Sequence, residues 1–288
     1  MKPPTIVIVG PTASGKTSLS IDLAERYNGE IISADSRAIY RHMDIGTAKP
    51  TIAEQARVKH WGIDLVDPDE CFTAYDFQQY AISKIEDIRS RGKIPFLVGG
   101  SGLYVDSVIF NYDFSQKHNT SIERSDLEVM STEELHLCCK NNNIPLPENN
   151  LNKRYLIRAI ETKGYMPNNR EQVKTGFSVV GITTPKEILV ERITNRADIM
   201  FNDNIVQETT FLTRRYNWNL ESMKSNIYRV IDEWQSGQLT LEEAKQKFIQ
   251  LDLRLVKKQL TWFKRNSQIN WFTLEEAKSH IEQLLNHI

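Results

Sequence analysis

The sequence predicts an α/β protein: a P-loop parallel sheet flanked by helices, with a small helical insertion domain and a helical C-terminal part. Three observations support this fold class. Short β-branched runs alternate with helix-like stretches in residues 1–111, these runs end in Gly or Asp, and the later chain is mostly helical in pattern. Such alternation is typical of parallel sheets covered on both faces, which bind ligands at the carboxyl ends of their strands.

The first part of the chain, residues 1–111, reads as repeated strand and helix units. Its first strand candidate runs directly into a glycine-rich loop, the second leads to Asp35, and the third leads to Gly99 and Gly100. The apolar runs are short enough for strands, and the stretches between them have helical spacing. The predicted elements are strands at residues 5–9, 30–34 and 94–98 and helices at residues 17–24 and 77–90.

The middle of the chain, residues 112–176, differs from the first part in composition and in hydrophobic pattern. It is rich in Asn and contains only short amphipathic pieces, at residues 133–139 and 154–161. Clusters of Asn and Pro interrupt regular structure, so we expect a small helical insertion here.

The last part, residues 177–288, returns one strand to the sheet at residues 179–182 and then continues as helices, the first at residues 186–200. Two later helices open with the same hexapeptide, Thr-Leu-Glu-Glu-Ala-Lys, beginning at Thr240 and at Thr273. Thr followed three residues later by Glu is a capping box, so both threonines are expected to cap a helix.

Composition and charge exclude several classes of protein. The 288 residues carry 36 basic and 37 acidic side chains, for a net charge of -1, and 40% are hydrophobic, which is typical of a globular protein. The apolar runs are too short for a membrane span, and the N-terminus lacks a signal-peptide pattern. Three cysteines are poor material for a disulfide framework. We therefore expect a cytoplasmic protein, independent of membranes.

The glycine-rich loop matches the phosphate-binding pattern of glycine, four residues and Gly-Lys-Thr, placed between a strand and a helix. Backbone amides at the helix N-terminus bind phosphate oxygens, Lys16 adds a positive charge, and the Thr17 hydroxyl is suited to ligate Mg²⁺. The predicted phosphate-binding residues are Gly10, Pro11, Thr12, Ala13, Ser14, Gly15, Lys16 and Thr17.

The loop alone leaves the reaction open, because kinases, ATPases and transferases all use it. The strand at residues 94–98 ends in glycines rather than in a metal-binding Asp, which disfavours a motor or switch protein. Asp35 instead lies at a strand end, where a doubly wound sheet places its cleft. Its carboxylate is suited to accept a proton from a nucleophile or to cap the following turn, and both roles stay open.

A basic run near the C-terminus contains Arg254, Lys257, Lys258, Lys264 and Arg265, with Trp262 and Phe263 among them. Helical spacing places Arg254, Lys258, Thr261 and Arg265 on one stripe and Ala244, Phe248, Leu251 and Leu255 on another. Basic residues beside aromatic ones suit a nucleic-acid backbone and its bases. The alternative is an ordinary solvated face.

Four blocks, in order, closely resemble the tRNA dimethylallyltransferase family. They are the loop at residues 10–17, the segment Ser-Ala-Asp-Ser-Arg-Ala-Ile-Tyr-Arg-His-Met-Asp-Ile-Gly-Thr-Ala-Lys-Pro at residues 33–50, Val-Gly-Gly-Ser-Gly-Leu-Tyr at residues 98–104, and Lys-Lys-Gln-Leu-Thr-Trp-Phe-Lys at residues 257–264. The long second block is the most specific of them.

The resemblance implies transfer of a dimethylallyl group from dimethylallyl diphosphate to N6 of adenosine 37 in the tRNA anticodon loop, with release of pyrophosphate. By family position, Asp35 takes the proton of the amine, and Lys16, Arg196 and a Mg²⁺ ion on Thr17 stabilise the leaving pyrophosphate. Ser101 corresponds to a family Thr near the reacting groups. We expect the enzyme to act as a monomer.

The resemblance also implies a set of tRNA contacts: Asp35, Ser36, Arg37, Ala38, Arg154, Tyr155, Arg158, Lys224, Tyr228, Arg229, Lys257, Lys258, Gln259, Trp262 and Lys264.

The chain departs from the family pattern at three places. Ile227 stands where the family has Gly, Asp252 and Leu253 stand where it has Thr-Arg before the final basic helix, and the insertion at residues 112–176 is shorter. The alternatives to a tRNA prenyltransferase are a prenyltransferase that acts on free adenine nucleotides, a nucleic-acid-binding module that has lost catalysis, and a P-loop small-molecule kinase.

Overall fold

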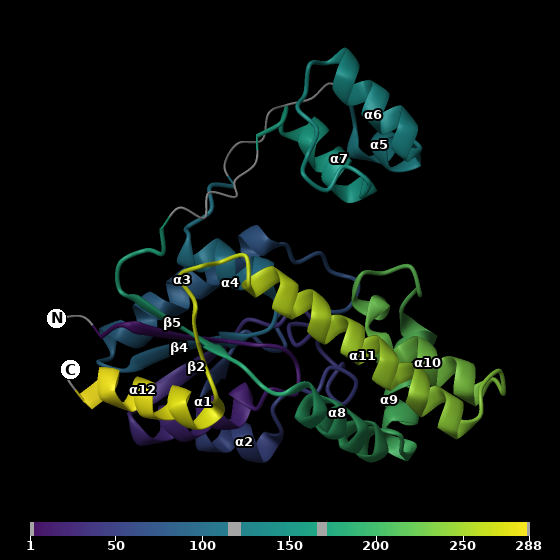
Figure 1. Cartoon of the computed structure of the whole chain (residues 1–288). Coiled ribbons are helices and arrows are strands. Elements are labelled where there is room, and N and C mark those ends of the chain that lie inside the picture. Colours follow the sequence, from purple (N-terminus) through teal and green to yellow (C-terminus); the bar gives the residue numbers. More distant parts are fainter. Residues whose placement is uncertain (1–2, 115–121, 166–171, 287–288) are drawn as a thin grey trace. The chain divides into compact units, whose positions relative to one another are not determined.

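The computed structural model describes residues 3–114, 122–165 and 172–286, and the chain divides into two compact units. The α/β unit comprises residues 1–109 and 172–288, and the insertion unit comprises residues 110–171. Figure 1 shows both units, with many of their helices and strands labelled.

A six-stranded sheet forms the centre of the α/β unit, in the order β3-β2-β4-β1-β5-β6. All neighbouring strands pair in parallel, with Val7 of β1 opposite Leu97 of β4 and Val179 of β5. β1 is buried throughout, as expected for a parallel strand covered on both faces. The predicted fold class is confirmed. The strands are β1 (Thr5–Val9), β2 (Gly29–Ser33), β3 (His60–Trp61), β4 (Ile94–Gly99), β5 (Phe177–Ile182) and β6 (Asn270–Phe272).

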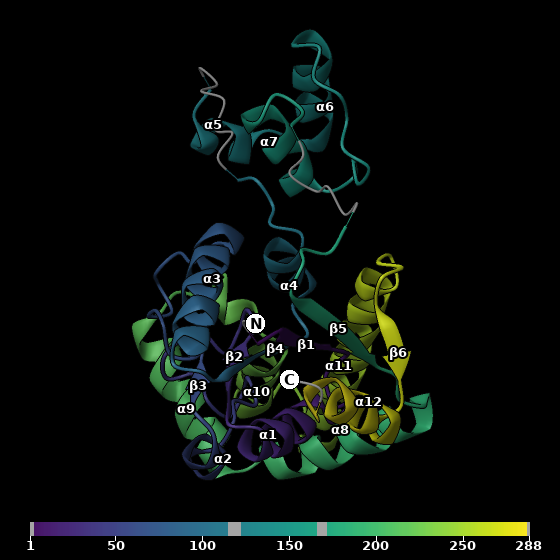
Figure 2. The same cartoon turned by 90° about the vertical axis from the view of Figure 1, so that its left-hand side faces the viewer.

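Helices cover both faces of this sheet (Figure 2). The side chains of α1 (Lys16–Arg26) and α12 (Leu274–Asn286) pack with Ile6 and Ile8 of β1 in one hydrophobic cluster. α3 (Ala74–Ser90) and α4 (Gly102–Ile109) lie on the other face and pack against β4. Because successive side chains of a strand point to opposite faces, β1 contributes to the packing of both layers.

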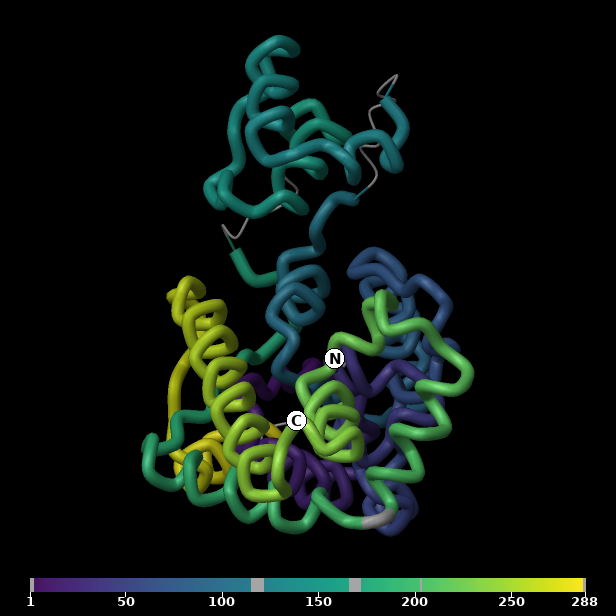
Figure 3. The backbone as a smooth tube through the Cα atoms, turned by 90° about the vertical axis from the view of Figure 1, so that its right-hand side faces the viewer, coloured from purple at the N-terminus to yellow at the C-terminus, as the bar shows by residue number. Residues whose placement is uncertain are grey.

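The remaining helices of this unit follow the sheet in sequence. α11 packs against both α8 and α10, and the tube in Figure 3 shows α10 and α11 side by side. The bounds are α2 (Ile52–Arg57), α8 (Lys186–Met200), α9 (Asp203–Arg215), the short 3₁₀ helix η1 (Ser222–Lys224), α10 (Asn226–Gln235) and α11 (Leu241–Phe263). In the described residues, no helix has both the length and the apolar character that a membrane span needs.

Local signals placed the C-terminal helices correctly. Thr240 accepts a hydrogen bond from the amide of Glu243, whose carboxylate accepts one in return, and Thr273 and Glu276 do the same before α12. Both predicted capping boxes are therefore confirmed.

Two features of the C-terminal part differ from the prediction. β6 interrupts the expected run of helices: its three residues are too few to show a strand period, and pairing with β5 defines them. The predicted apolar stripe of α11 is buried at Ala244 and Phe248 and 37% exposed at Leu255, whereas Asp252 is 5% exposed. Asp252 and Leu253 also lie inside the basic helix rather than before it.

The insertion unit has a hydrophobic core of its own. Its helices are α5 (Arg124–Val129), α6 (Thr132–Asn141) and α7 (Lys153–Glu161). Leu127, Leu135, Cys139 and Leu156 are fully buried within a single cluster. A separate core of this kind is the mark of an independently packed unit.

Candidate active site

The phosphate loop leaves the end of β1 and enters α1 at Lys16. Ala13 and Gly15 both have positive φ, at 61° and 89°, which turns the loop back on itself. The N-terminus of α1 has no side-chain cap, so its first amides are available to an anion. Lys16 Nζ donates to the Pro11 carbonyl at 2.8 Å, which folds this side chain across the loop.

The ammonium group of Lys16 lies in a crowded pocket. Burial lowers its pKa from 10.5 to about 8, an effect that Asp35 opposes and the positive charge of Arg196 reinforces. A bound anion would favour the charged form, so the protonation state of Lys16 depends on whether the loop holds an anionic ligand.

Two arginines of α8 hold the loop from one side. Arg192 Nη1 donates to the Ala13 carbonyl at 3.1 Å, and Arg196 Nη1 donates to Thr12 Oγ1 at 2.9 Å. Residues four apart share a helix face, so one face of α8 presents both cations to the loop. Sequence reasoning named Arg196 from the family resemblance and missed Arg192. The spacing of the two arginines was the signal that could have found it.

Asp35 follows β2 and lies near Ser36 and Ser101. Asp35 Oδ1 accepts the Arg37 amide at 2.8 Å, so Asp35 does cap the following turn. Ser101 Oγ accepts the Ser36 amide at 2.9 Å and donates to Ser36 Oγ at 3.1 Å, which links the ends of β2 and β4. The turn engages only one carboxylate oxygen of Asp35, so capping leaves the proton-accepting role open.

α11 contacts the same loop from another side. The Thr12 amide donates to Gln259 Oε1 at 2.8 Å, and Trp262 Nε1 donates to Asp106 Oδ2 at 2.8 Å. A Cβ atom added at Gly102 would lie 2.0 Å from the Trp262 ring. The small residue at the start of α4 therefore permits the close approach of α11.

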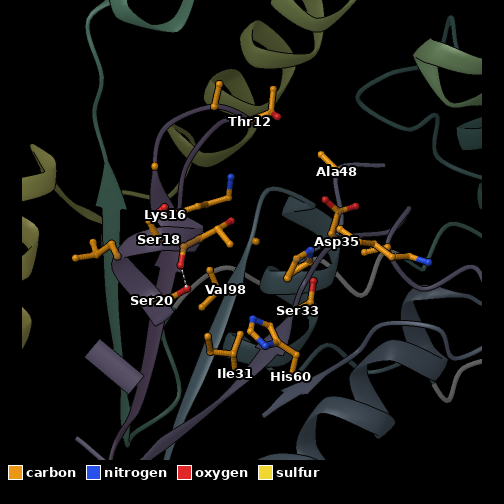
Figure 4. Close-up of a pocket in the computed structure, with 18 of the residues that line it drawn as sticks. Thr12, Lys16, Ser18, Ser20, Ile31, Ser33, Asp35, Ala48, His60 and Val98 are labelled. Atoms are coloured by element: carbon orange, nitrogen blue, oxygen red, sulfur yellow. Dashed lines mark hydrogen bonds between the residues drawn. The ribbon is translucent and has the colours of Figure 1, made fainter. Parts of the chain in front are cut away.

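Two cavities meet at the phosphate loop. The first, about 690 Å³, runs from the loop past Ile31 and His60, and the second, about 340 Å³, runs past Ser101 and Lys258. Figure 4 shows Thr12, Lys16 and Asp35 around the first cavity, with Ile31 and His60 at its other end. The residues common to both walls are Thr12, Lys16, Asp35, Thr47, Ala48 and Arg196. This arrangement suits two ligands that meet at Lys16 and Asp35.

Glu208 of α9 fixes the segment that carries Thr47 and Ala48. Its carboxylate accepts the amides of Asp44, Ile45 and Gly46 at 2.8 to 2.9 Å. The Tyr228 hydroxyl also donates to Glu208, at 2.9 Å. Sequence reasoning missed Glu208, because a lone Glu in an amphipathic helix carries no local signal for such a role.

The predicted tRNA contacts lie in different environments. Tyr228 is fully buried and Ala38 is 3% exposed, so neither offers much surface to a partner. Arg37 donates to the carbonyl and carboxylate of Glu221, and Lys224 pairs with the same carboxylate at 3.0 Å. Arg229 is exposed.

The remaining predicted contacts fall on α11 and on the insertion unit. Lys257, Lys258 and Lys264 are exposed, whereas Gln259 and Trp262 are partly buried against the loop and α4. In α7, Arg154 and Tyr155 are exposed and Arg158 pairs with Glu161 at 3.3 Å. The structure thus brings Asp35, Ser36, Lys224, Lys258 and Gln259 to one cavity and leaves the α7 residues in a separate unit.

A parallel sheet whose first strand runs into a lysine-bearing glycine-rich loop, with two cavities meeting there, defines a P-loop α/β protein. The family model for IPP transferase matches residues 38–266. The chain belongs to this family, and the predicted family is confirmed.

Relatives and solved structures agree over the whole chain. A tRNA dimethylallyltransferase of Staphylococcus saprophyticus is 36% identical over 304 residues, covering 100% of this chain and 96% of the relative. One from Streptococcus thermophilus is 38% identical over 283 residues, covering 96% and 93%. The crystal structure of the full-length tRNA isopentenylpyrophosphate transferase of Bacillus halodurans has a TM-score of 0.75 at 34% identity and covers 99% and 98%. The prediction of a prenyltransferase is confirmed, and these names do not favour the kinase or free-nucleotide alternatives.

Proposed function

We propose that this chain transfers the dimethylallyl group of dimethylallyl diphosphate to N6 of adenosine 37 in a tRNA anticodon loop, releasing pyrophosphate. The observation that carries the proposal is the pair of cavities that meet at Lys16, Arg196 and Asp35. The first cavity suits the diphosphate donor and is called the donor cavity. The second suits the acceptor base and is called the acceptor cavity. The cations and the carboxylate lie at their junction. The relatives named above support this choice of substrates.

The donor diphosphate would lie on the phosphate loop. The free amides at the start of α1, the Lys16 ammonium and the Arg196 guanidinium would stabilise the negative charge that develops on the leaving pyrophosphate. In this reaction the bond between the allylic carbon and the diphosphate oxygen breaks, and its electron pair leaves with pyrophosphate.

A Mg²⁺ ion fits this site through the Thr17 hydroxyl, which lines the donor cavity at the start of α1. The described residues contain no cluster of three His, Cys, Asp or Glu side chains that could hold a metal. A protein hydroxyl completed by diphosphate oxygens and water is a usual Mg²⁺ environment. When bound, the ion would offset negative charge on the diphosphate.

The acceptor amine needs a base. The lone pair of an adenine N6 is delocalised into the ring, so loss of its proton as the new C–N bond forms lowers the barrier. We assign that proton to Asp35, which lies at the junction of the two cavities. Ser101, through its hydrogen bonds to Ser36, positions the turn that carries Asp35.

The tRNA would bind over the second cavity. Adenosine 37 is stacked in the anticodon loop, so it must be extruded to reach Asp35. The exposed lysines of α11 would hold the phosphate backbone beside the cavity, and Trp262 would fix α11 against α4. We further propose that the insertion unit contributes Arg154, Tyr155 and Arg158 to the same RNA.

The proposal is tested by incubating the protein with Mg²⁺, dimethylallyl diphosphate and unmodified tRNA bearing adenosine 37, followed by nuclease digestion and mass spectrometry. We expect N6-dimethylallyladenosine. Product with AMP or ATP in place of tRNA, and none with tRNA, would contradict the assigned acceptor.

Replacing Asp35 tests the assigned base. We expect Asp35→Asn to lower kcat by about 10² to 10⁴, the usual contribution of a general base, while pyrophosphate binding is retained. Asp69→Asn, an exposed carboxylate outside both cavities, is the matched control. Near-normal turnover of Asp35→Asn would exclude Asp35 as the base.

A further inference from the structure

Asp252 places a buried carboxylate in the wall of the acceptor cavity. It lies on α11 and is 5% exposed. Asn226 Nδ2 donates to its Oδ1 at 3.1 Å, and Arg196 Nη1 lies 3.6 Å from its Oδ2. Burial raises the pKa of Asp252, whereas the Asn226 hydrogen bond and the charge of Arg196 oppose that rise. Buried carboxylates persist when they are paired in this way.

Arg196 stands between this carboxylate and the phosphate loop. The same nitrogen, Nη1, donates to Thr12 Oγ1 at 2.9 Å and faces Asp252 at 3.6 Å. Its side chain is 26% exposed, compared with 8% for Asp252, so the pair is screened only partly by solvent. Any diphosphate on the loop must therefore share this guanidinium with an anion already present in the protein.

We propose that Asp252 is the counter-charge of Arg196: it orients the guanidinium toward the loop and weakens the hold of the loop on diphosphate and pyrophosphate. This inference rests on the proposed function, in which the loop binds a diphosphate. The physical basis is competition between two anions for one cation, together with repulsion between like charges in a partly buried site. Asp252 is thus a positioning residue that also tunes the release of pyrophosphate.

The inference predicts a direction that a loss of structure cannot produce. Removing a buried group usually loosens a site and weakens binding. Removing the Asp252 charge should instead free Arg196 for the ligand and tighten binding. The matched control for the Asp252 substitution is Asp198→Asn. Asp198 also pairs with a cation between α8 and α11, since it lies 2.6 Å from Lys245. Its side chain, however, is 57% exposed and lines neither cavity.

The test is titration calorimetry of the full chain with inorganic pyrophosphate in the presence of Mg²⁺. We expect Asp252→Asn and Asp252→Thr to bind pyrophosphate about ten-fold more tightly than the wild type, as for removal of one nearby like charge. Asp252→Glu, which keeps the charge, and Asp198→Asn should stay near the wild-type Kd. By the family resemblance described above, Thr corresponds to position 252, so Asp252→Thr serves as a second neutral variant.

Steady-state kinetics give a second measurement. We expect the neutral variants to show a lower KM for dimethylallyl diphosphate and stronger inhibition by pyrophosphate. Unchanged or weaker pyrophosphate binding in both folded neutral variants would overturn the inference while leaving the proposed function intact. A wild-type protein that fails to bind pyrophosphate would overturn both.

Discussion

Lys16 and Asp35 show how far the chemistry of a residue depends on its neighbours. The motif identifies Lys16 as a phosphate ligand, but its lowered pKa follows from burial and from Arg196, which is distant in sequence. Asp35 shows the same dependence. Its place at the end of β2 was predictable, whereas its position at the junction of two cavities required the folded chain.

The lowered pKa of Lys16 predicts a pH dependence for ligand binding. With a pKa of about 8, Lys16 is charged below pH 8 and loses its proton as the pH rises. We expect the affinity for pyrophosphate to fall about ten-fold between pH 7 and pH 9, because only the charged form attracts the anion. Calorimetry at several pH values measures this effect.

The control for this prediction is Lys16→Arg, whose guanidinium stays charged throughout that range. Ionisation of pyrophosphate itself affects both proteins equally, so the difference between their pH profiles reports Lys16. Parallel profiles would show that Lys16 keeps its charge up to pH 9.

At the scale of elements, α11 has two separate tasks. One side carries Asp252 and Gln259, which face Arg196 and the Thr12 amide. The other side carries Lys257 and Lys264, which are exposed and make no ion pair within the described residues. A single helix of 23 residues therefore connects the phosphate loop to the proposed RNA surface.

The exposed side of α11 predicts a salt dependence. We expect Lys257→Ala and Lys264→Ala each to weaken tRNA binding and to reduce the slope of log K against log salt concentration by about 0.7 to 0.9, the value for one lost phosphate contact. Fluorescence anisotropy with labelled tRNA at several salt concentrations measures the slope.

Lys247→Ala is the matched control for that series, because Lys247 lies on the same helix but pairs with Glu233. Its slope should equal that of the wild type. If Lys257→Ala and Lys264→Ala also keep the wild-type slope, these lysines belong to a solvated face and the RNA binds elsewhere.

At the scale of the whole molecule, the chain consists of two units with separate cores. The insertion unit packs Leu127, Leu135 and Leu156 in its own cluster. In the α/β unit, the Lys174 amide donates to the Ile109 carbonyl at 2.8 Å, so the chain leaves and re-enters this unit at neighbouring points. The two ends of the α/β unit that flank the insertion therefore lie close enough to be joined without it.

This arrangement predicts that the insertion unit can be removed. Replacing residues 110–171 with a short Gly-Ser linker should leave a folded protein with wild-type pyrophosphate affinity, because the linker joins points that are already close. Binding of tRNA should weaken, since Arg154 and Tyr155 are lost. Circular dichroism, calorimetry and anisotropy measure the three quantities.

Two results would contradict this prediction. An unfolded variant would show that the α/β unit needs the insertion for stability. Unchanged tRNA affinity would show that the insertion unit makes no energetic contribution to RNA binding.

The sequence by itself determined the features that depend on local order. The central strands of the sheet, the phosphate loop and the capping boxes at Thr240 and Thr273 each follow from residue types at short, fixed spacing. Such patterns act within a few residues, so they can be interpreted without knowing the fold. The family resemblance then directed attention to Asp35 and Arg196.

The tertiary structure alone decided which distant groups meet. Gln259 accepts the amide of Thr12 across 247 residues of sequence, Glu208 holds the Asp44 to Gly46 segment, and Asp252 faces Arg196. None of these pairs has a sequence period, because each is created by helices packing around the ends of strands. Side-chain charge and burial then follow from that packing, and they set the electrostatics of the site.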